Sequence, residues 1–286
     1  MTTYQYRLLN VFSLEDQPLS GNPLCVFEDA RGLDAQTMQA LALQFNLSET
    51  TFILPSDRAT AQVRIFTPSY ELPFAGHPTL GTAHVVRELH NTGNALTLQT
   101  QAGVIPVSAE QNKWTLQANK PRARAVAASS EQLAEMLGVA VSDLASLSQS
   151  PPLWVDAGTE LLVLPLASVD AVARCNPKLE LLWQHARLTD TRFLVYVWSP
   201  ATAEEIAVRF FFAKGMSVAE DPATGAACAA LGGWFISTGA TLPVNRRVLQ
   251  GAAVGRASVL GLHVDTDSRI FVSGEVIELG RGVIHL

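Results

Sequence analysis

The sequence has 286 residues, of which 48% are hydrophobic and 16% are charged, and its formal net charge is −6. This length suits two domains, and the low charged fraction indicates surface buried internally or against a second copy, so a homodimer is expected. The acidic balance, with no block of Lys and Arg, disfavours nucleic acid as a partner. No signal-peptide pattern and no apolar run of about 18 residues is evident, which predicts a cytoplasmic protein that does not enter membranes.

The chain begins with alternating strand-like and helix-like stretches. A strand is predicted over 6–12, and a turn at Gly21-Asn22-Pro23 leads into a second strand over 24–27. Asp34 is placed to cap a helix whose apolar residues recur with helical spacing, and this pattern ends near Asn46.

A strand, a loop and a helix follow as one unit. A strand over 52–54 precedes an alternating strand over 61–67, after which a Pro-rich loop runs to His77 and a helix begins at Pro78. Short strands are expected near Leu96, Val104 and Trp114, and the polar, Ala-rich stretch 120–130 is interpreted as a domain junction.

The second half repeats this order of elements. A helix is predicted over 131–137, strands over 161–164, 193–198, 206–212, 257–262 and 270–279, an apolar helix over 226–236, and a final turn at Gly280-Arg281-Gly282. Gly76–Ala83 laid over Glu220–Ala227 matches at Pro, Gly and Ala, with Arg64 and Arg209 upstream, which indicates internal duplication.

Both repeated helices are apolar almost all round, which is typical of a buried helix. We therefore expect an α/β (α+β) fold of two pseudo-symmetric halves, 1–119 and 120–286, each a curved sheet around a central helix. The last strands are allowed to cross to the first half.

Two helix starts are candidates for binding an anion. His77-Pro78 and Asp221-Pro222 each stand before an apolar helix, whose unpaired N–H groups and positive dipole end favour a carboxylate. A second interpretation remains open for each: Asp is a favoured N-cap with Pro as the first helical residue, and a lone His is often structural.

Glu49 is the candidate acid or base. It follows Asn46 by three residues, the spacing of a capping box, but the residues after it are β-branched or aromatic and predict a strand. A carboxyl group at a strand start among apolar neighbours is expected to have a raised pKa suited to proton transfer.

A set of motifs spans nearly the whole chain. They are Gly21-Asn22-Pro23, residues 46–52, Arg64-Ile65-Phe66-Thr67-Pro68, residues 71–78, residues 220–227, Leu249-Gln250-Gly251, Gly255-Arg256 and Gly280-Arg281-Gly282. In these motifs the chain resembles the phenazine-biosynthesis PhzF family of isomerases, which share the diaminopimelate epimerase fold. The resemblance implies mostly antiparallel sheets, a single cleft between the halves and a homodimer.

The resemblance also implies an activity. Glu49 would be the general acid/base, with His77 and Asp221 as its polar partners, and the phenazine enzymes isomerise trans-2,3-dihydro-3-hydroxyanthranilate by moving a proton from C3 to C1 without cofactor or metal. The small carboxylate substrate would be held by Ser48, Gly76, Thr224, Gly225 and Ala226. The sequence departs from the family motif at Ala226, where the family usually has Ser, so the substrate is less defined than the reaction class.

Other functions are weighed against this one. A two-thiol racemase or epimerase of another amino acid would need a cysteine at each helix start, whereas Cys25, Cys175 and Cys228 lie elsewhere. A small-acid-binding or inactive relative would keep the site without turnover. No GxGxxG or GxxxxGK[ST] indicates a nucleotide, and no third ligand with zinc-like spacing accompanies His77 and His84.

Overall fold

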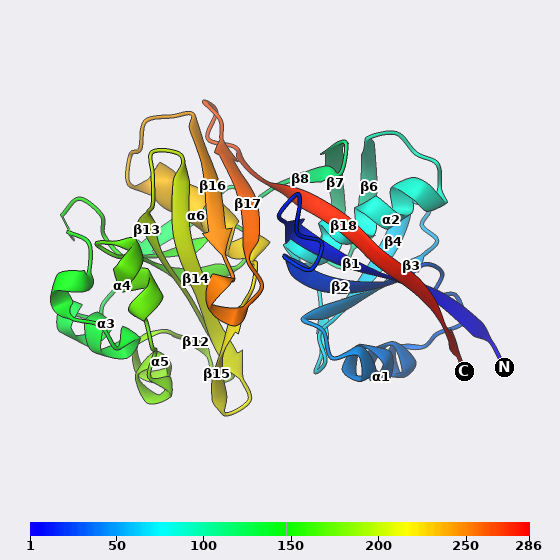
Figure 1. Cartoon of the computed structure of the whole chain (residues 1–286), viewed down its shortest axis with the longest axis horizontal. Helices are drawn as coiled ribbons and strands as arrows, with labels where there is room; N and C mark the ends of the chain where they lie inside the picture. The colour runs from blue at the N-terminus through cyan, green and yellow to red at the C-terminus, as the bar shows by residue number, and fades with distance from the viewer. Residues whose placement is uncertain (147) are drawn as a thin grey trace. The chain divides into compact units, whose positions relative to one another are not determined.

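The computed structural model describes residues 1–146 and 148–286. Contacts divide the chain into two compact units: unit 1 is Met1–Gln117 with Ser273–Leu286, and unit 2 is Ala118–Val272. Strands and helices are mixed in both units (Figure 1), so the fold class is α+β and rich in strands. The domain limits at 119 and 120 stay a prediction, because contacts within one conformation do not show which part folds independently.

The strands of unit 1 close into a ring. Around the ring each strand pairs with the next, and β18 pairs with both β8 and β1. Figure 1 shows β18 running beside β1. The ring strands are β1 (Thr3–Ser13), β2 (Asn22–Phe27), β3 (Glu49–Leu54), β4 (Ala61–Phe66), β6 (Ala95–Thr100), β7 (Gly103–Glu110), β8 (Lys113–Gln117) and β18 (Ile270–His285), and the short β5 (Glu71–Leu72) pairs with β4.

Helix α2 (Gly76–Leu89) forms the centre of unit 1. It contacts β1, β2, β3, β4, β6 and β8, and every residue from Gly76 to Val86 is buried. This stretch contains no Asp, Glu, Lys or Arg, so its burial leaves no charge without solvent. Helix α2 is thus enclosed by the strands of unit 1.

Helix α1 (Ala35–Phe45) packs on β3 and β4 and confirms the local capping signals. The Asp34 side chain accepts a hydrogen bond from the Thr37 N–H at 2.7 Å, and Asn46 ends the helix with a φ of 51°. Both residues are of the types that favour these two positions.

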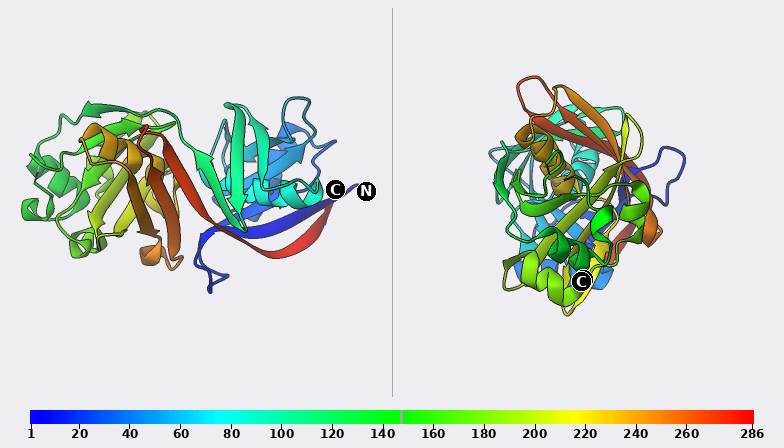
Figure 2. Two further views of the ribbon diagram at one scale, coloured as in Figure 1. Left: turned by 90° about the horizontal axis from the view of Figure 1, so that it is seen from above. Right: turned by 90° about the vertical axis from the view of Figure 1, so that its left-hand side faces the viewer.

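The strands of unit 2 form a second curved layer around α6 (Gly225–Ser237), which contacts β9, β10, β11 and β17. The golden helix lies beside these strands in both views of Figure 2. The strands are β9 (Arg122–Ala125), β10 (Leu153–Asp156), β11 (Glu160–Pro165), β12 (Arg187–Thr189), β13 (Arg192–Pro200), β14 (Glu205–Lys214), β15 (Ser217–Asp221), β16 (Val244–Gln250) and β17 (Ser258–Val264).

A separate core in unit 2 buries the short helices that the sequence only partly predicts. Leu133, Leu137, Val172 and Leu182 pack there with β11 and β13 residues such as Val195. The helices concerned are α3 (Ser130–Leu137), α4 (Val169–Arg174) and α5 (Leu179–His185), and the 3-10 turns η1 (Val141–Asp143) and η2 (Ala252–Val254) complete the unit.

An ion pair recurs at corresponding places in the two units. Arg64 on β4 makes two hydrogen bonds with Glu71 on β5, and Arg209 on β14 makes three with Glu220 on β15. Each arginine also lies over the phenylalanine two residues later in its strand.

This correspondence corrects the predicted overlay of the two halves. It places Pro73 with Pro222 and Gly76 with Gly225, whereas the overlay placed Gly76 on Glu220, five residues away. Pro, Gly and Ala are too common at helix starts to fix a register, while a partly buried ion pair between two strands does so.

The final predicted turn is also wrong. β18 continues through Gly280 and Gly282 to His285, paired with β1 throughout. Space at Gly282 is tight, since a Cβ there would lie 2.4 Å from the hydroxyl oxygen of Tyr6, its partner across the pair, and the Tyr6 ring would have to shift. Within the part of the chain that the structure describes, no helix is long and apolar enough to cross a membrane.

Candidate functional site

Glu49 and His77 come together in unit 1. Glu49 is the first residue of β3 and His77 the second of α2, and His77 Nδ1 lies 3.5 Å from Glu49 Oε2. The Glu49 side chain is 17% exposed and that of His77 is 6% exposed. The capping-box interpretation of Glu49 is wrong, because the residue begins a strand and not a helix. Its predicted role in proton transfer remains a proposal.

His77 is a neutral group. Burial lowers its pKa to about 3, although a hydrogen bond with the Pro23 backbone opposes this shift. Nε2 is buried and makes no hydrogen bond with the residues that the structure describes. The ring proton is therefore assigned to Nδ1, which faces Pro23 and Glu49, and Nε2 presents a lone pair.

The start of α2 offers backbone donors. Its N-cap residue is Ala75, which has no side-chain acceptor, and Gly76 is the first helical residue. Backbone N–H groups of a first turn without a side-chain cap are suited to binding an anion. Ser48 is half-buried and directly precedes Glu49 in the sequence. The helix begins two residues before the predicted Pro78.

Asp221 lies in unit 2 and is not a helix cap. It is the last residue of β15, and α6 begins at Gly225 with Thr224 as its N-cap. The Thr224 hydroxyl donates to Asp221 Oδ2 at 2.5 Å. The interpretation of Asp221 as the N-cap, with Pro222 as the first helical residue, is therefore wrong.

Ala226 is the second residue of α6 and occupies the place that His77 has in α2. It is half-buried, and Gly225 before it is buried. Its methyl group therefore lies in the first turn of the helix and offers no hydrogen bond.

The predicted site residues therefore form two groups, one in each unit. Ser48, Glu49, Gly76 and His77 belong to unit 1, and Asp221, Thr224, Gly225 and Ala226 to unit 2. That both groups act on one substrate remains a proposal.

Gln250, the last residue of β16, contacts the second group, although the sequence indicated it only as part of a family motif. Its amide is hydrogen-bonded to both Asp221 and Thr224. The available signal was a Gln at the end of a strand, directly before Gly251, which places an amide next to a turn.

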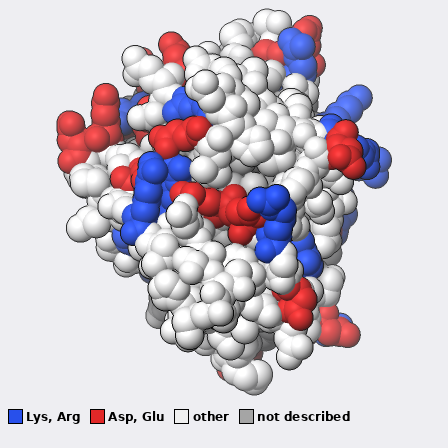
Figure 3. Space-filling view, turned by 90° about the vertical axis from the view of Figure 1, so that its right-hand side faces the viewer, with Lys and Arg blue, Asp and Glu red and all other residues white. Residues whose placement is uncertain are grey.

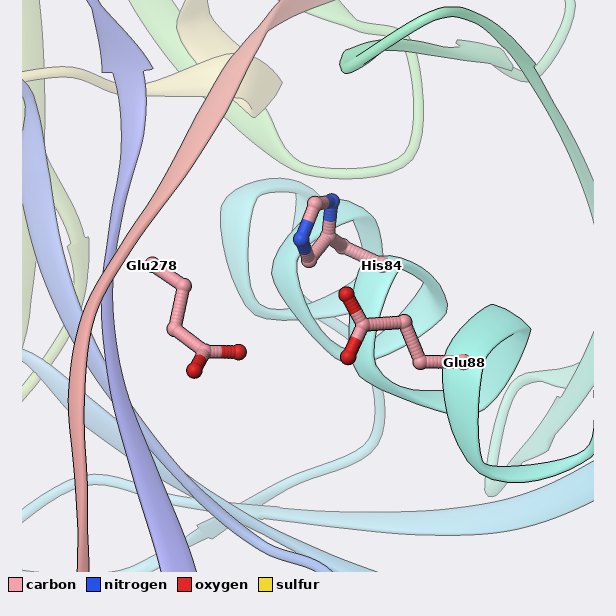
Figure 4. Close-up of side chains that lie close together, drawn as sticks. All are labelled: His84, Glu88 and Glu278. Carbon is pink, nitrogen blue, oxygen red and sulfur yellow. The ribbon is translucent and has the colours of Figure 1, made fainter.

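A further polar group sits away from both sets of residues. His84 and Glu88 on α2 and Glu278 on β18 point toward one another (Figure 4), with ligand atoms within 4.8 Å. The nearly buried Arg7 binds Glu88 and Glu278, and the Trp114 indole N–H donates to His84 Nδ1 at 3.4 Å.

His84, Glu88 and Glu278 belong to an ion-pair cluster with Arg7 and Arg281. The guanidinium groups of Arg7 and Arg281 already bind the carboxylates of Glu88 and Glu278, and the indole bond occupies one lone pair of the imidazole. Acidic and basic side chains are likewise interleaved on the face shown in Figure 3.

The cysteines do not provide a pair of acid and base thiols. All three are buried, and burial raises the pKa of Cys175 to about 12 and that of Cys228 further. Cys228 is the fourth residue of α6, and the first turn of α2 contains no cysteine.

Comparisons with known proteins agree on one family. The family described as "Phenazine biosynthesis-like protein" matches residues 9–282. An uncharacterized isomerase of Pasteurella multocida (strain Pm70) is 38% identical over 290 residues, covering 100% of this chain and 96% of that protein. Trans-2,3-dihydro-3-hydroxyanthranilate isomerase of Pseudomonas chlororaphis is 33% identical over 296 residues, covering 99% and 100%. A crystal structure of a PhzF-family protein from Bacillus anthracis, 24% identical, covers both chains fully with a TM-score of 0.87 and shows the same fold.

Proposed function

Because this chain belongs to the phenazine biosynthesis-like protein family and is an isomerase, we propose that it moves a proton on a small carboxylic acid, with Glu49 as the general acid/base and without cofactor or metal. The observation that carries this proposal is the position of Glu49. Its side chain is 17% exposed at the start of β3, and its Oε2 lies beside the neutral imidazole of His77.

Glu49 is better suited than His77 to carry the proton. A general acid/base must exchange its proton near the working pH, and His77, with a pKa of about 3, stays neutral there. The imidazole instead supplies hydrogen bonds, with Nε2 able to accept one from a substrate hydroxyl or ammonium group. In the proposed step Glu49 removes a proton from one carbon, the double bonds shift, and the same carboxyl group returns the proton to another carbon.

The proposed substrate class is a small carboxylic or amino acid, and trans-2,3-dihydro-3-hydroxyanthranilate is the first candidate. Two relatives that carry this substrate in their names are 33% and 32% identical to the chain over nearly its full length. Helix starts without side-chain caps, at Gly76 and Gly225, would bind the carboxylate. Asp221 would act on the same substrate, and Ser48, Thr224 and Ala226 would border it.

Deuterium exchange tests the proposal directly. The purified chain is incubated with trans-2,3-dihydro-3-hydroxyanthranilate in D₂O, and proton NMR follows deuterium entering at C1. Glu49→Gln should lower this rate by roughly 10²- to 10⁴-fold at unchanged thermal stability. Glu160→Gln, which alters an exposed carboxylate, is the matched control. Exchange that persists in Glu49→Gln at the wild-type rate contradicts the role of Glu49.

Ala226 favours a second candidate, an isomerase or epimerase of a different small acid. The missing hydroxyl removes one hydrogen bond at a helix start, so a ring acid that uses this bond would bind less well. A panel of amino and hydroxy acids in D₂O, screened with wild type and Ala226→Ser, separates the candidates. Equal affinity of the two proteins for ring acids would contradict the argument, and binding without exchange for every acid would indicate a binding protein.

The low charged fraction supports a homodimer as the proposed assembly. Sedimentation equilibrium measures its mass against the 30.7 kDa of the single chain.

A further inference from the structure

We propose that Gln250 is a positioning residue, whose amide sets the direction of the Thr224 hydroxyl and thereby holds the carboxylate of Asp221. This inference rests on the proposed function, in which Asp221 acts on the substrate.

Three hydrogen bonds join the Gln250 amide to the turn between Asp221 and Thr224. Nε2 donates to the Asp221 carbonyl at 2.8 Å and to the Thr224 hydroxyl oxygen at 3.0 Å. Oε1 accepts from the Thr224 backbone N–H at 3.2 Å. Gln250 is only 3% exposed, so water has little access to replace these bonds.

The chemistry of the amide fixes the direction of each bond. An amide nitrogen can only donate, so the Thr224 oxygen must accept from Gln250. The one proton of the hydroxyl is then directed to Asp221 Oδ2, where a charge-assisted bond of 2.5 Å is found. A flipped amide would place Oε1 against the Asp221 carbonyl oxygen, so one orientation is strongly preferred.

The backbone on both sides of this contact is held in place. Gly251 has a φ of 81°, and a Cβ there would lie 2.4 Å from the Pro222 carbonyl oxygen, so the end of β16 packs directly on the turn. On the other side, Glu220 is fixed by its ion pair with Arg209 at 2.7 Å. The side chain of Asp221 is thus oriented between two fixed segments.

The corresponding place in unit 1 lacks this arrangement. The parallel pairs β4–β6 and β14–β16 place Thr100 where unit 2 has Gln250, and Leu72 where it has Asp221. Among the residues that the structure describes, the Thr100 hydroxyl bonds only within its own turn, donating to Gly103 O and accepting from the Ala102 N–H. The long amide of Gln250 therefore occurs in the unit that carries Asp221.

The groups around Asp221 bear on any measurement of its ionisation. Arg209 and Glu220 pair with each other, and the hydroxyl of Tyr196 and the thiol of Cys228 are buried. Tyr196, Phe210 and Asp221 lie in one row across β13, β14 and β15. Variants at Gln250 and Thr224 leave all of these side chains unchanged.

A titration of Asp221 tests the proposal without any substrate. Carbon NMR follows the Asp221 carboxyl carbon with pH, assigned by its loss in Asp221→Asn, in wild type, Gln250→Met, Thr224→Val and the double variant. We expect Gln250→Met and Thr224→Val each to move the midpoint up by about one pH unit, because the charged form loses a hydrogen bond. The double variant should move little further than Thr224→Val alone. Thr100→Val is the control and should not move it.

Turnover gives the second readout. In the deuterium-exchange assay, Gln250→Met should lower kcat by about 10- to 100-fold with a smaller change in KM, and Thr224→Ser, which keeps the hydroxyl, should retain most of the rate. If Gln250→Met fails to fold, Gln250→Glu replaces it in wild-type and Thr224→Val backgrounds. If Gln250 acts on Asp221 through the Thr224 hydroxyl, Gln250→Glu shifts the Asp221 midpoint more in the wild-type background than in the Thr224→Val background. If only the added charge acts, the two shifts are equal.

An Asp221 midpoint that moves in Thr224→Val but not in Gln250→Met overturns the proposal. Lack of exchange in the wild type would overturn the proposed function instead, and the titration would still decide the role of Gln250.

Discussion

His77 Nδ1 lies 3.5 Å from Glu49 Oε2, yet the two side chains do not form an ion pair, because burial keeps the imidazole neutral. A protonated imidazole at this distance would stabilise the carboxylate and weaken it as a base. A neutral one leaves the proton affinity of Glu49 to other neighbours.

The buried His77 should make the protein sensitive to acid. Its pKa falls from 6.5 to about 3 on folding, so below pH 6.5 the unfolded chain binds a proton that the folded chain excludes. The stability due to this residue is complete above pH 6.5 and is lost as the pH falls toward 3. The slope is at most about 1.4 kcal/mol per pH unit. Urea unfolding gives the free energy of unfolding of wild type and of His77→Gln between about pH 4.5 and pH 7. The stability advantage of wild type over His77→Gln should shrink as the pH falls. The exposed His285→Gln is the control, and a difference that does not change with pH would contradict the assignment.

The ion pair of Arg209 and Glu220 should be important for stability. Arg209 also donates to the carbonyl oxygens of Val172, Ala173 and Cys175 at the end of α4. Glu220→Ala leaves this partly buried guanidinium without its carboxylate, which should cost about 3 kcal/mol in the free energy of unfolding. The exposed pair of Arg124 and Glu160 is the matched control, and Glu160→Ala should cost under about 1 kcal/mol. Equal losses in the two variants would show that burial of the pair is not the cause.

Two glycines of β18 should respond differently to alanine. A Cβ at Gly282 would meet the Tyr6 ring, which packs against Phe45 at 5.0 Å, whereas one at Gly280 meets nothing within 4 Å. Gly282→Ala should lower the free energy of unfolding by about 1 to 3 kcal/mol. Gly280→Ala should change it by less than about 0.5 kcal/mol. Chemical denaturation of both variants measures these values, and a neutral Gly282→Ala would mean that the ring moves at little cost.

Thiol reagents should leave the native enzyme active. Burial raises the pKa of Cys25, Cys175 and Cys228 and so suppresses the reactive thiolate. Iodoacetamide at about pH 8 should label no thiol while the chain is folded, and all 3 cysteines after unfolding in urea, as mass spectrometry can count. Loss of exchange activity in step with labelling of the folded protein would instead favour a thiol mechanism.

Signals contained in a few neighbouring residues predicted the structure well. The helix between Asp34 and Asn46 follows from its caps, and the strand after Glu49 from β-branched residues. The enclosed helices follow from a lack of charge. In each case the deciding signal lies within one continuous segment of the chain.

Features that depend on distant residues were wrong or missed. Gly280 and Gly282 read as a turn because the Tyr6 ring that lies against Gly282 is nearly the whole chain away. Asp221-Pro222 read as a helix start because the strand partner that holds Asp221 in β15 is not adjacent in sequence. The cluster around Arg7 and the contact of Gln250 were missed for the same reason.

The closed ring of unit 1 has a consequence for the order in which the protein is made. Its last strand, β18, completes the pairing between β8 and β1, and it is synthesised after all of unit 2. A nascent chain that has emerged only as far as Gln117 therefore presents two unpaired strand edges, which are prone to associate with other chains. The unit that leaves the ribosome first is the one that must wait longest to close, so it is the one expected to need protection by chaperones during translation.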